Sequence, residues 1–292
     1  MRYYAYRGEE PNFGDELNHF LMPRLLGDMV DGRDDPLVLG IGSILFDHHP
    51  AHVTKLVLGA GYGGYTAKPV IDERWKFYAV RGPRTAEALG LDRRLVAADL
   101  AVLIHRHRPP VTGKTHKRSF IPHFQSLYRA DWNSVARQAD MHFIDPRWPV
   151  EQVLDAIEQS ELLVAEAMHG AIVADALRTP WVALTPLDPQ HQFKWHDWAE
   201  ALGMKLAPRP LAAASLYEVL DNFRLAGRSG KRFIRPWKKQ LRGFSRAGFE
   251  ARAAASLAQA ARAEPMLSSD AALTGAVAHL EESLAAVRRD FA

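Results

Sequence analysis

The feature that most constrains the fold is the stretch Leu162–Leu177, where an apolar run leads through a His-Gly pair into an Ala-rich apolar segment. The first four residues, Leu162–Ala165, predict a strand buried on both faces, and the apolar residues of Ala171–Leu177 recur at helical spacing. The short turn between them places His169 at a helix N-terminus. In open α/β sheets, ligands bind at such positions, because free N–H groups attract anions there. A histidine that merely packs at the strand end is the alternative.

Composition narrows the class of protein. With 292 residues, 47% of them hydrophobic, the chain is long enough for two packed cores. It contains no cysteine, which excludes disulfides and thiol chemistry. It begins without a signal-like apolar core and has no apolar run near the roughly 20 residues that span a bilayer, so a cytoplasmic protein is predicted. The net charge of +3 is too small to predict nucleic-acid binding.

Apolar runs separated by helix-length segments predict parallel strands covered by helices. In the first hundred residues these runs are Tyr3–Tyr6, Leu37–Ile41, Leu56–Leu58, Phe77–Val80 and Leu95–Ala98. A second series consists of Ser119–Pro122, Met141–Ile144, Leu162–Ala165 and Trp181–Leu184, with a predicted helix over Val150–Gln159. A polar, basic stretch rich in Pro and Gly separates the two series. The sequence therefore predicts an α/β protein with Rossmann-like domains over 1–108 and 119–222, a linker over 109–118 and a basic, helical C-terminal extension over 223–292.

Two polar loops follow predicted strands and are candidates for ligand binding. Asp15 stands near the start of a predicted helix, where it is either a helix cap or a ligand-contacting group. Arg81 and Arg84 lie near the start of another, where a cation opposes the helix dipole. An arriving anion would favour arginine there, and ordinary surface ion pairs are the alternative.

Metal binding is not predicted. His48 and His52 have the spacing of a helical ligand pair, but Pro50 between them breaks the helix that would align them.

The C-terminal extension begins with a strongly basic segment. Residues 223–249 contain nine basic residues and no acidic ones. The basic residues are Arg224, Arg228, Lys231, Arg232, Arg235, Lys238, Lys239, Arg242 and Arg246, and the interleaved apolar residues are Phe233, Ile234, Trp237, Leu241 and Phe244. This pattern is typical of a segment that binds an anionic membrane surface, with a solvated basic helix as the equal alternative. Nucleic-acid binding is disfavoured, because no reader motif accompanies the patch.

The last segment, Ser269–Ala292, carries one apolar helical stripe. It is expected either to pack on the body of the protein or to pair with a second copy in a homo-oligomer.

Five motifs in this order resemble the polysaccharide pyruvyl transferase family, in particular its branch in bacterial exopolysaccharide assembly. The resemblance covers about residues 1–205 and rests on Asn12-Phe-Gly-Asp15, Val80-Arg81-Gly-Pro-Arg84-Thr85, Ile121-Pro-His123-Phe, Glu166-Ala-Met-His169-Gly170 and Gln190-His191-Gln-Phe-Lys194-Trp195-His-Asp197-Trp198. It implies a fold of two domains like that of the GT-B glycosyltransferases, phosphoenolpyruvate as donor, a pyruvate ketal on a hexose as product and a lipid-linked oligosaccharide as acceptor. Other members of the family have an arginine two residues before the histidine that corresponds to His169, whereas this chain has Ala167 there.

The chemistry implied by the resemblance assigns roles to individual residues. Phosphoenolpyruvate carries a carboxylate and a phosphate, so its site needs clustered cations and N–H groups. Ketal formation needs an acid and a base, with no redox cofactor and no obligatory metal. The expected catalytic residues are His169, Asp15 and Glu166; the expected donor-binding residues are Arg81, Arg84, His123, Gly170, His191 and Lys194; and the expected acceptor-binding residues are Asn12, Trp195 and Trp198. For the two tryptophans, core packing is the favoured alternative.

Two other functions stay open at this point. A GT-B-type glycosyltransferase would use a nucleotide sugar, and a saccharide-binding protein without catalysis would use the aromatic residues alone. For the pyruvyl transferase, the expected location is the cytoplasm, peripheral on the inner face of the cell membrane.

Overall fold

A computed structural model describes residues 1–108, 110–111, 113–186, 188–226 and 237–291, which form an α/β protein with two four-stranded parallel sheets. The prediction of an α/β fold with parallel sheets is confirmed. The first sheet has the order β1-β2-β3-β4 and consists of β1 (Arg2–Tyr3), β2 (Leu37–Leu39), β3 (Lys55–Leu58) and β4 (Trp75–Ala79). The second has the order β6-β5-β7-β8 and consists of β5 (Ser119–Ile121), β6 (His142–Phe143), β7 (Leu163–Ala165) and β8 (Trp181–Ala183).

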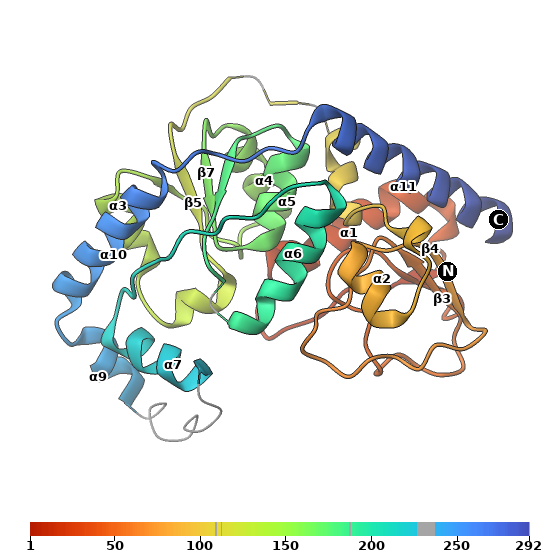
Figure 1. The fold of residues 1–292 in the computed structure, drawn as a ribbon, viewed down its shortest axis with the longest axis horizontal. Coiled ribbons are helices and arrows are strands. Elements are labelled where there is room, and N and C mark those ends of the chain that lie inside the picture. Colours follow the sequence, from red (N-terminus) through yellow and green to blue (C-terminus); the bar gives the residue numbers. More distant parts are fainter. Residues whose placement is uncertain (109, 112, 187, 227–236, 292) are drawn as a thin grey trace.

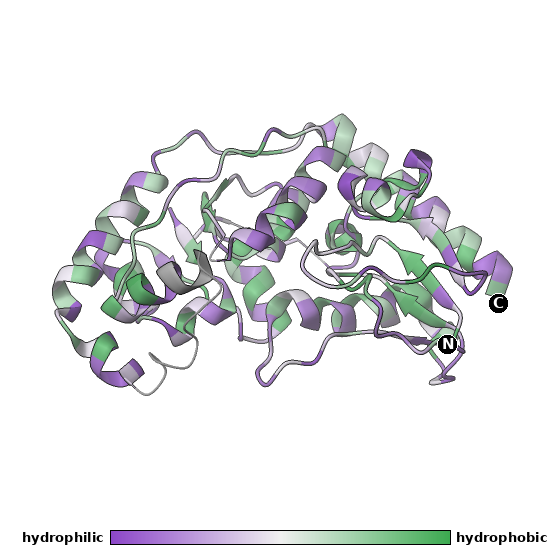
Figure 2. Ribbon diagram, turned by 60° about the horizontal axis from the view of Figure 1, so that its bottom comes forward, coloured by the Kyte–Doolittle hydropathy of each residue, from purple (hydrophilic) through white to green (hydrophobic). Residues whose placement is uncertain are grey.

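Helices cover both sheets, and Figure 2 shows strands that are mostly hydrophobic beside helices of mixed hydropathy. The α-helices are α1 (Phe13–Leu26), α2 (Pro83–Leu89), α3 (Trp132–Gln138), α4 (Val150–Glu158), α5 (Met168–Ala176), α6 (Gln192–Ala201), α7 (Leu216–Ala226), α9 (Lys238–Gly243), α10 (Arg246–Ala260) and α11 (Asp270–Phe291). Short 3₁₀ helices are η1 (Gly27–Met29), η2 (Arg93–Leu95), η3 (Leu100–Arg106), η4 (Phe124–Tyr128) and η5 (Pro189–His191).

One hydrophobic core runs through both halves of the molecule. Helix α5, which connects β7 to β8 of the second sheet, packs on η3 and α1 from the first half. Leu17, Leu103 and Ile172, one from each of these elements, are each at most 1% exposed and belong to the same apolar cluster. This packing fixes the loops at the carboxyl ends of the two sheets relative to each other.

The strand expected over Leu95–Ala98 is a wrong prediction. Leu95 ends the 3₁₀ turn η2, and the structure forms only an isolated parallel bridge between Val80 and Val96. Two aspartates explain the short pairing. The side chain of Asp92 accepts a hydrogen bond from Arg94 N and starts η2, and that of Asp99 accepts one from Ala101 N and starts η3. These turns leave only Val96–Ala98 extended between them, and of these only Val96 forms a bridge to the neighbouring chain segment.

The C-terminal segment contacts both halves. Helix α10 packs on α3, and α11 crosses back to lie on β3, β4 and α1 of the first half (Figure 1). The predicted apolar stripe is buried in that contact, so packing on the body is confirmed over pairing with another chain; its residues are Leu273, Val277, Leu280, Leu284 and Val287. Part of the basic segment lies outside the described residues, namely Arg228, Lys231, Arg232, Phe233, Ile234 and Arg235.

Candidate functional site

His169 lies in the first turn of α5, directly after β7, as the sequence predicts. Its side chain is 14% exposed, and its Nε2 atom lies 3.6 Å from Asp99 Oδ2. Neither of these two atoms has a hydrogen-bond partner among the described residues. If the two side chains move slightly closer, the Asp99 carboxylate can accept a hydrogen bond from the Nε2–H group and fix the orientation of the imidazole ring.

Asp99 is a site residue that the sequence prediction missed. Its side chain is fully buried, and its Oδ1 atom is held by the Ala101 N–H at 3.1 Å, which leaves Oδ2 facing the histidine. The signal that could have found it is an acidic residue directly after the apolar residues Val96–Ala98, at the end of a predicted strand. Burying a carboxylate oxygen without a hydrogen-bond partner costs free energy of folding. The unpaired Oδ2 atom therefore indicates a functional role for Asp99.

The motif near the N-terminus lies against the Nδ1 side of the His169 ring. A Cβ atom at Gly14 would lie 2.1 Å from His169 Nδ1, so only glycine lets α1 approach the ring this closely. Asn12, at the start of α1, donates a hydrogen bond from Nδ2 to Asp15 Oδ2 at 2.8 Å. Two motifs that are about half the chain apart therefore meet at His169.

Asp15 and Lys194 form the charged part of this cluster. Burial raises the pKa of Asp15, while the Asn12 hydrogen bond and the charges of His169 and Lys194 oppose the rise. Burial and the charge of Arg81 lower the pKa of Lys194 to about 8, although Asp15 and Asp188 oppose this. Lys194 is thus a partly desolvated ammonium group that is still mostly charged at pH 7.

Two further predicted residues, His123 and His191, lie beside Lys194. Their ring centroids are 5.3 Å apart, and the Tyr65 ring lies 5.4 Å from His191. Burial and the charge of Lys194 lower the pKa of His191 to about 3, and the pKa of His123 is also held well below its ordinary value by burial. Both imidazoles are therefore neutral near pH 7 and can donate or accept single hydrogen bonds.

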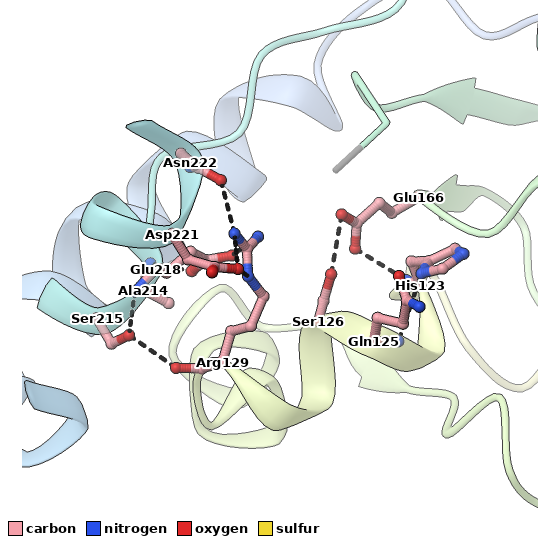
Figure 3. Close-up of polar contacts among 10 residues, drawn as sticks. All are labelled: His123, Gln125, Ser126, Arg129, Glu166, Ala214, Ser215, Glu218, Asp221 and Asn222. Carbon is pink, nitrogen blue, oxygen red and sulfur yellow. Dashed lines mark hydrogen bonds and ion pairs between the residues drawn. The ribbon is translucent and has the colours of Figure 1, made fainter. Parts of the chain in front are cut away.

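Glu166 supports the loop that carries His123, as Figure 3 shows. One carboxylate oxygen accepts a hydrogen bond from His123 N at 2.8 Å, and the other accepts one from Ser126 Oγ at 3.0 Å. The side chain is 5% exposed, and its burial raises the pKa to about 7. Its contacts are those of a group that positions His123; the catalytic role expected of Glu166 stays a prediction.

The raised pKa of Glu166 predicts a pH-dependent stability. The folded state keeps the proton up to about pH 7, whereas the unfolded chain loses it near 4.5, so the stabilisation present at low pH is lost as the pH rises between these values. Glu166→Gln removes this loss. Relative to wild type, the free energy of unfolding of the variant should rise between these pH values by on the order of 3 kcal/mol. Denaturant titrations across this range measure it, with exposed Glu161→Gln as control; a constant difference would contradict the assignment.

The two predicted arginines have partners within the protein. Arg81 is fully buried and donates to Asp197 Oδ2 at 2.9 Å, to Ser43 Oγ at 2.8 Å and to the Tyr62 carbonyl at 2.7 Å. Arg84 forms a two-bond ion pair with Glu200 at the surface. Arg81 thus fastens α6 to the loops of the first half and places its charge behind Lys194, whereas Arg84 lies apart from the cluster. Donor binding by either residue stays a prediction.

The acceptor-binding role expected of two tryptophans needs correction. Trp195 and Trp198 are 1% and 0% exposed and pack against Trp181, whose ring centroid is 5.3 Å from that of Trp198. A sugar cannot stack on rings that the core covers completely. The structure therefore supports the alternative of core packing for both.

Gly170 has a packing reason as well as its predicted ligand role. A Cβ atom there would lie 2.8 Å from Ile121 Cγ2, so glycine lets the start of α5 approach the end of β5.

Within the described part of the chain, no group of three or more His, Cys, Asp or Glu residues is arranged so that it could hold a metal ion. Among the same residues, every helix is too short or too polar to cross a membrane.

Comparisons with known proteins support the resemblance seen in the motifs. The family profile for polysaccharide pyruvyl transferase matches residues 55–189. The chain is also 33% identical, over 316 aligned positions that cover 100% of both proteins, to the succinoglycan biosynthesis protein ExoV of Rhizobium meliloti (strain 1021). The alignment with this relative spans both sheets and the positions of the cluster around His169. The chain therefore belongs to the polysaccharide pyruvyl transferase family and is an enzyme of that class.

Proposed function

We propose that this enzyme transfers pyruvate from phosphoenolpyruvate to two hydroxyl groups of one hexose in a lipid-linked oligosaccharide, during exopolysaccharide assembly. The observation that best supports this is the cluster of the Asp99–His169 pair, Asp15 and Lys194. It combines a group suited to proton transfer with a partly desolvated cation. The relative named for succinoglycan biosynthesis supports an exopolysaccharide as the destination of the product.

The donor anions are held by Lys194, His123 and His191, with the free N–H groups at the start of α5 around Gly170. A phosphate and a carboxylate beside a desolvated ammonium group gain charge-assisted hydrogen bonds. The helix N-terminus adds partial positive charge without a side chain. The charge of Arg81, fixed behind Lys194, adds to the positive potential.

Proton balance explains how one histidine serves the whole reaction. His169 gives a proton to the methylene carbon of phosphoenolpyruvate, and the first sugar hydroxyl adds to C2 and returns its proton to His169. The C2–O bond to phosphate then breaks as phosphate takes that proton, and the second hydroxyl closes the ketal and again returns its proton. One hydroxyl proton thus ends on the new methyl group and the other on phosphate, with no net oxidation or reduction, and we propose that the reaction uses neither a redox cofactor nor a metal. Asp15, which Asn12 orients, positions the acceptor hydroxyls.

We infer a GT-B-like arrangement of the two halves. Asp15 follows β1 of the first sheet, His123 and His169 follow β5 and β7 of the second sheet, and Lys194 follows β8. Ligands of open parallel sheets bind at the carboxyl ends of the strands. We place the reaction in the cytoplasm at the inner face of the cell membrane, where a soluble phosphorylated donor meets a lipid-linked acceptor.

Ligand-induced stabilisation tests the donor. In a buffer containing EDTA, phosphoenolpyruvate at a hundredfold excess over its Kd should stabilise the protein by about 2.7 kcal/mol. Thermal-shift titration measures this, and nucleotide sugars serve as the comparison. Stabilisation by nucleotide sugars and not by phosphoenolpyruvate would favour the glycosyltransferase alternative, and a response to neither would favour saccharide binding without this donor.

A further inference from the structure

Helices α7 and α9 form a lobe at the end of the molecule opposite the two termini (Figure 1). Two large aromatic side chains stand out from it. Trp237, just before α9, and Phe244, just after it, are each 62% exposed. Because these two rings flank a helix that carries lysine and arginine, they are candidates for contact with a lipid interface.

A cationic cavity of about 460 Å³ lies beside these aromatics. Its charged lining residues are Lys238, Lys239, Arg242, Arg246, Asp131 and Glu250. Arg246 is neutralised within the protein, because it donates to Asp131 and to Glu250 at 2.6 Å each. Lys239 and Arg242 form no ion pair with any described residue, so their charges are available to an anion.

We propose that this lobe is the surface by which the enzyme docks on an anionic phospholipid bilayer, with a lipid phosphate in the cavity beside Lys239 and Arg242. Charge complementarity is the first argument, since α9 carries three basic residues and no acidic one. The second is the pairing of cations with exposed Trp and Phe, because aromatic rings enter the lipid interface while the cations hold the head groups. A soluble phosphate ligand would need the cations but not the exposed rings.

Buried ion pairs tie this lobe firmly to the candidate active site (Figure 3). Arg129, at the end of η4, is 3% exposed and donates from Nε to Asp221 Oδ2 at 2.8 Å and from Nη2 to Asn222 Oδ1 at 3.0 Å, both on α7. At the other end of η4, Ser126 and His123 are held by Glu166. Because α9 packs on α7, the docking surface is connected to the donor-binding loop through α7 and η4. That this connection presents the site to a lipid-linked acceptor rests on the proposed function; the binding of lipid does not.

Vesicle co-sedimentation tests the surface. Vesicles of phosphatidylglycerol and phosphatidylcholine should bind the full-length protein, those of phosphatidylcholine alone should not, and the binding should fall steeply with salt. The double variant Lys239→Gln/Arg242→Gln should bind the anionic vesicles on the order of 30-fold more weakly. The double variant Trp237→Ala/Phe244→Ala should also bind more weakly, but with an unchanged salt dependence.

A matched control removes the same charge elsewhere. Lys68 and Arg93 are exposed on the first half of the chain, so Lys68→Gln/Arg93→Gln should keep wild-type binding. Equal loss in this control, no binding of wild type to anionic vesicles, or tighter binding to single-stranded oligonucleotides would each overturn the proposal. Pyruvate transfer to a soluble acceptor analogue separates the two claims. If the enzyme transfers pyruvate but does not bind vesicles, only the docking surface is refuted. If it binds vesicles but does not transfer pyruvate, only the proposed function is refuted.

Discussion

Replacing His169 by alanine is expected to lower turnover at least roughly a hundredfold while the fold and the affinity for phosphoenolpyruvate are kept. The reason is the position of the ring, between buried Asp99 on one side and Gly14 with Asp15 on the other. A group that both gives and takes the transferred protons cannot be replaced by water at the same site without this loss. Single-turnover pyruvate transfer measures the rate, and calorimetry measures donor affinity. His52→Ala, at an exposed position, is the control.

Asp99→Asn distinguishes catalysis by the pair from a purely structural role of the aspartate. An amide fills the same space, but it holds no negative charge beside the imidazole, so turnover should fall. Because Asp99 acts through His169, the double variant Asp99→Asn/His169→Ala should be no slower than His169→Ala alone. Near-wild-type turnover in His169→Ala would remove the histidine from the mechanism, and fully additive losses would separate Asp99 from it.

The sequence was sufficient to predict the position of His169, because a strand, a short turn and a helix are local patterns. It was not sufficient to find Asp99 as its partner, since the two residues meet only through the packing of η3 on α5. The acidic residue after an apolar run was visible, but its neighbour in space was not. The strand expected just before Asp99 failed for a related reason, because the aspartate caps there start turns that hydrophobic pattern alone does not show.

Burial is the other quantity that the sequence could not supply. The motif around Lys194 contains a cation and two tryptophans, and each residue type suits a sugar-phosphate site. The structure separates them, because α6 turns Trp195 and Trp198 into the core and leaves Lys194 beside His191 and His123. Arg81 likewise has the right charge, but its guanidinium is already bound to Asp197. Helical periodicity predicts which face of a helix is buried only where the apolar residues form a clear stripe. In α6 the charged and aromatic residues alternate along the sequence, so its buried face could not be predicted.

Lys194→Ala is expected to weaken the binding of phosphoenolpyruvate by roughly 2 to 5 kcal/mol, because it leaves a buried anion without its charge-assisted partner. That is a loss in affinity of about 30-fold to several thousandfold. Arg81 is a poorer test of the same site, since its removal would leave the carboxylate of Asp197 buried and unpaired and would act first on folding. Lys205→Ala, at an exposed lysine, is the control. Calorimetric titration of each variant measures the difference.

The pH dependence of donor binding separates the charge of Lys194 from its shape. The pKa of Lys194 is about 8, so the ammonium form present at pH 7 is lost as the pH rises through this value. In the wild type, donor affinity should therefore fall with increasing pH above about 8, at most tenfold per pH unit. Lys194→Arg keeps its charge throughout this range, so its affinity for the donor should stay constant even if the altered shape makes it weaker overall. A wild-type affinity that does not change across this range, together with an unchanged Kd in Lys194→Ala, would mean that other groups hold the phosphate and the carboxylate.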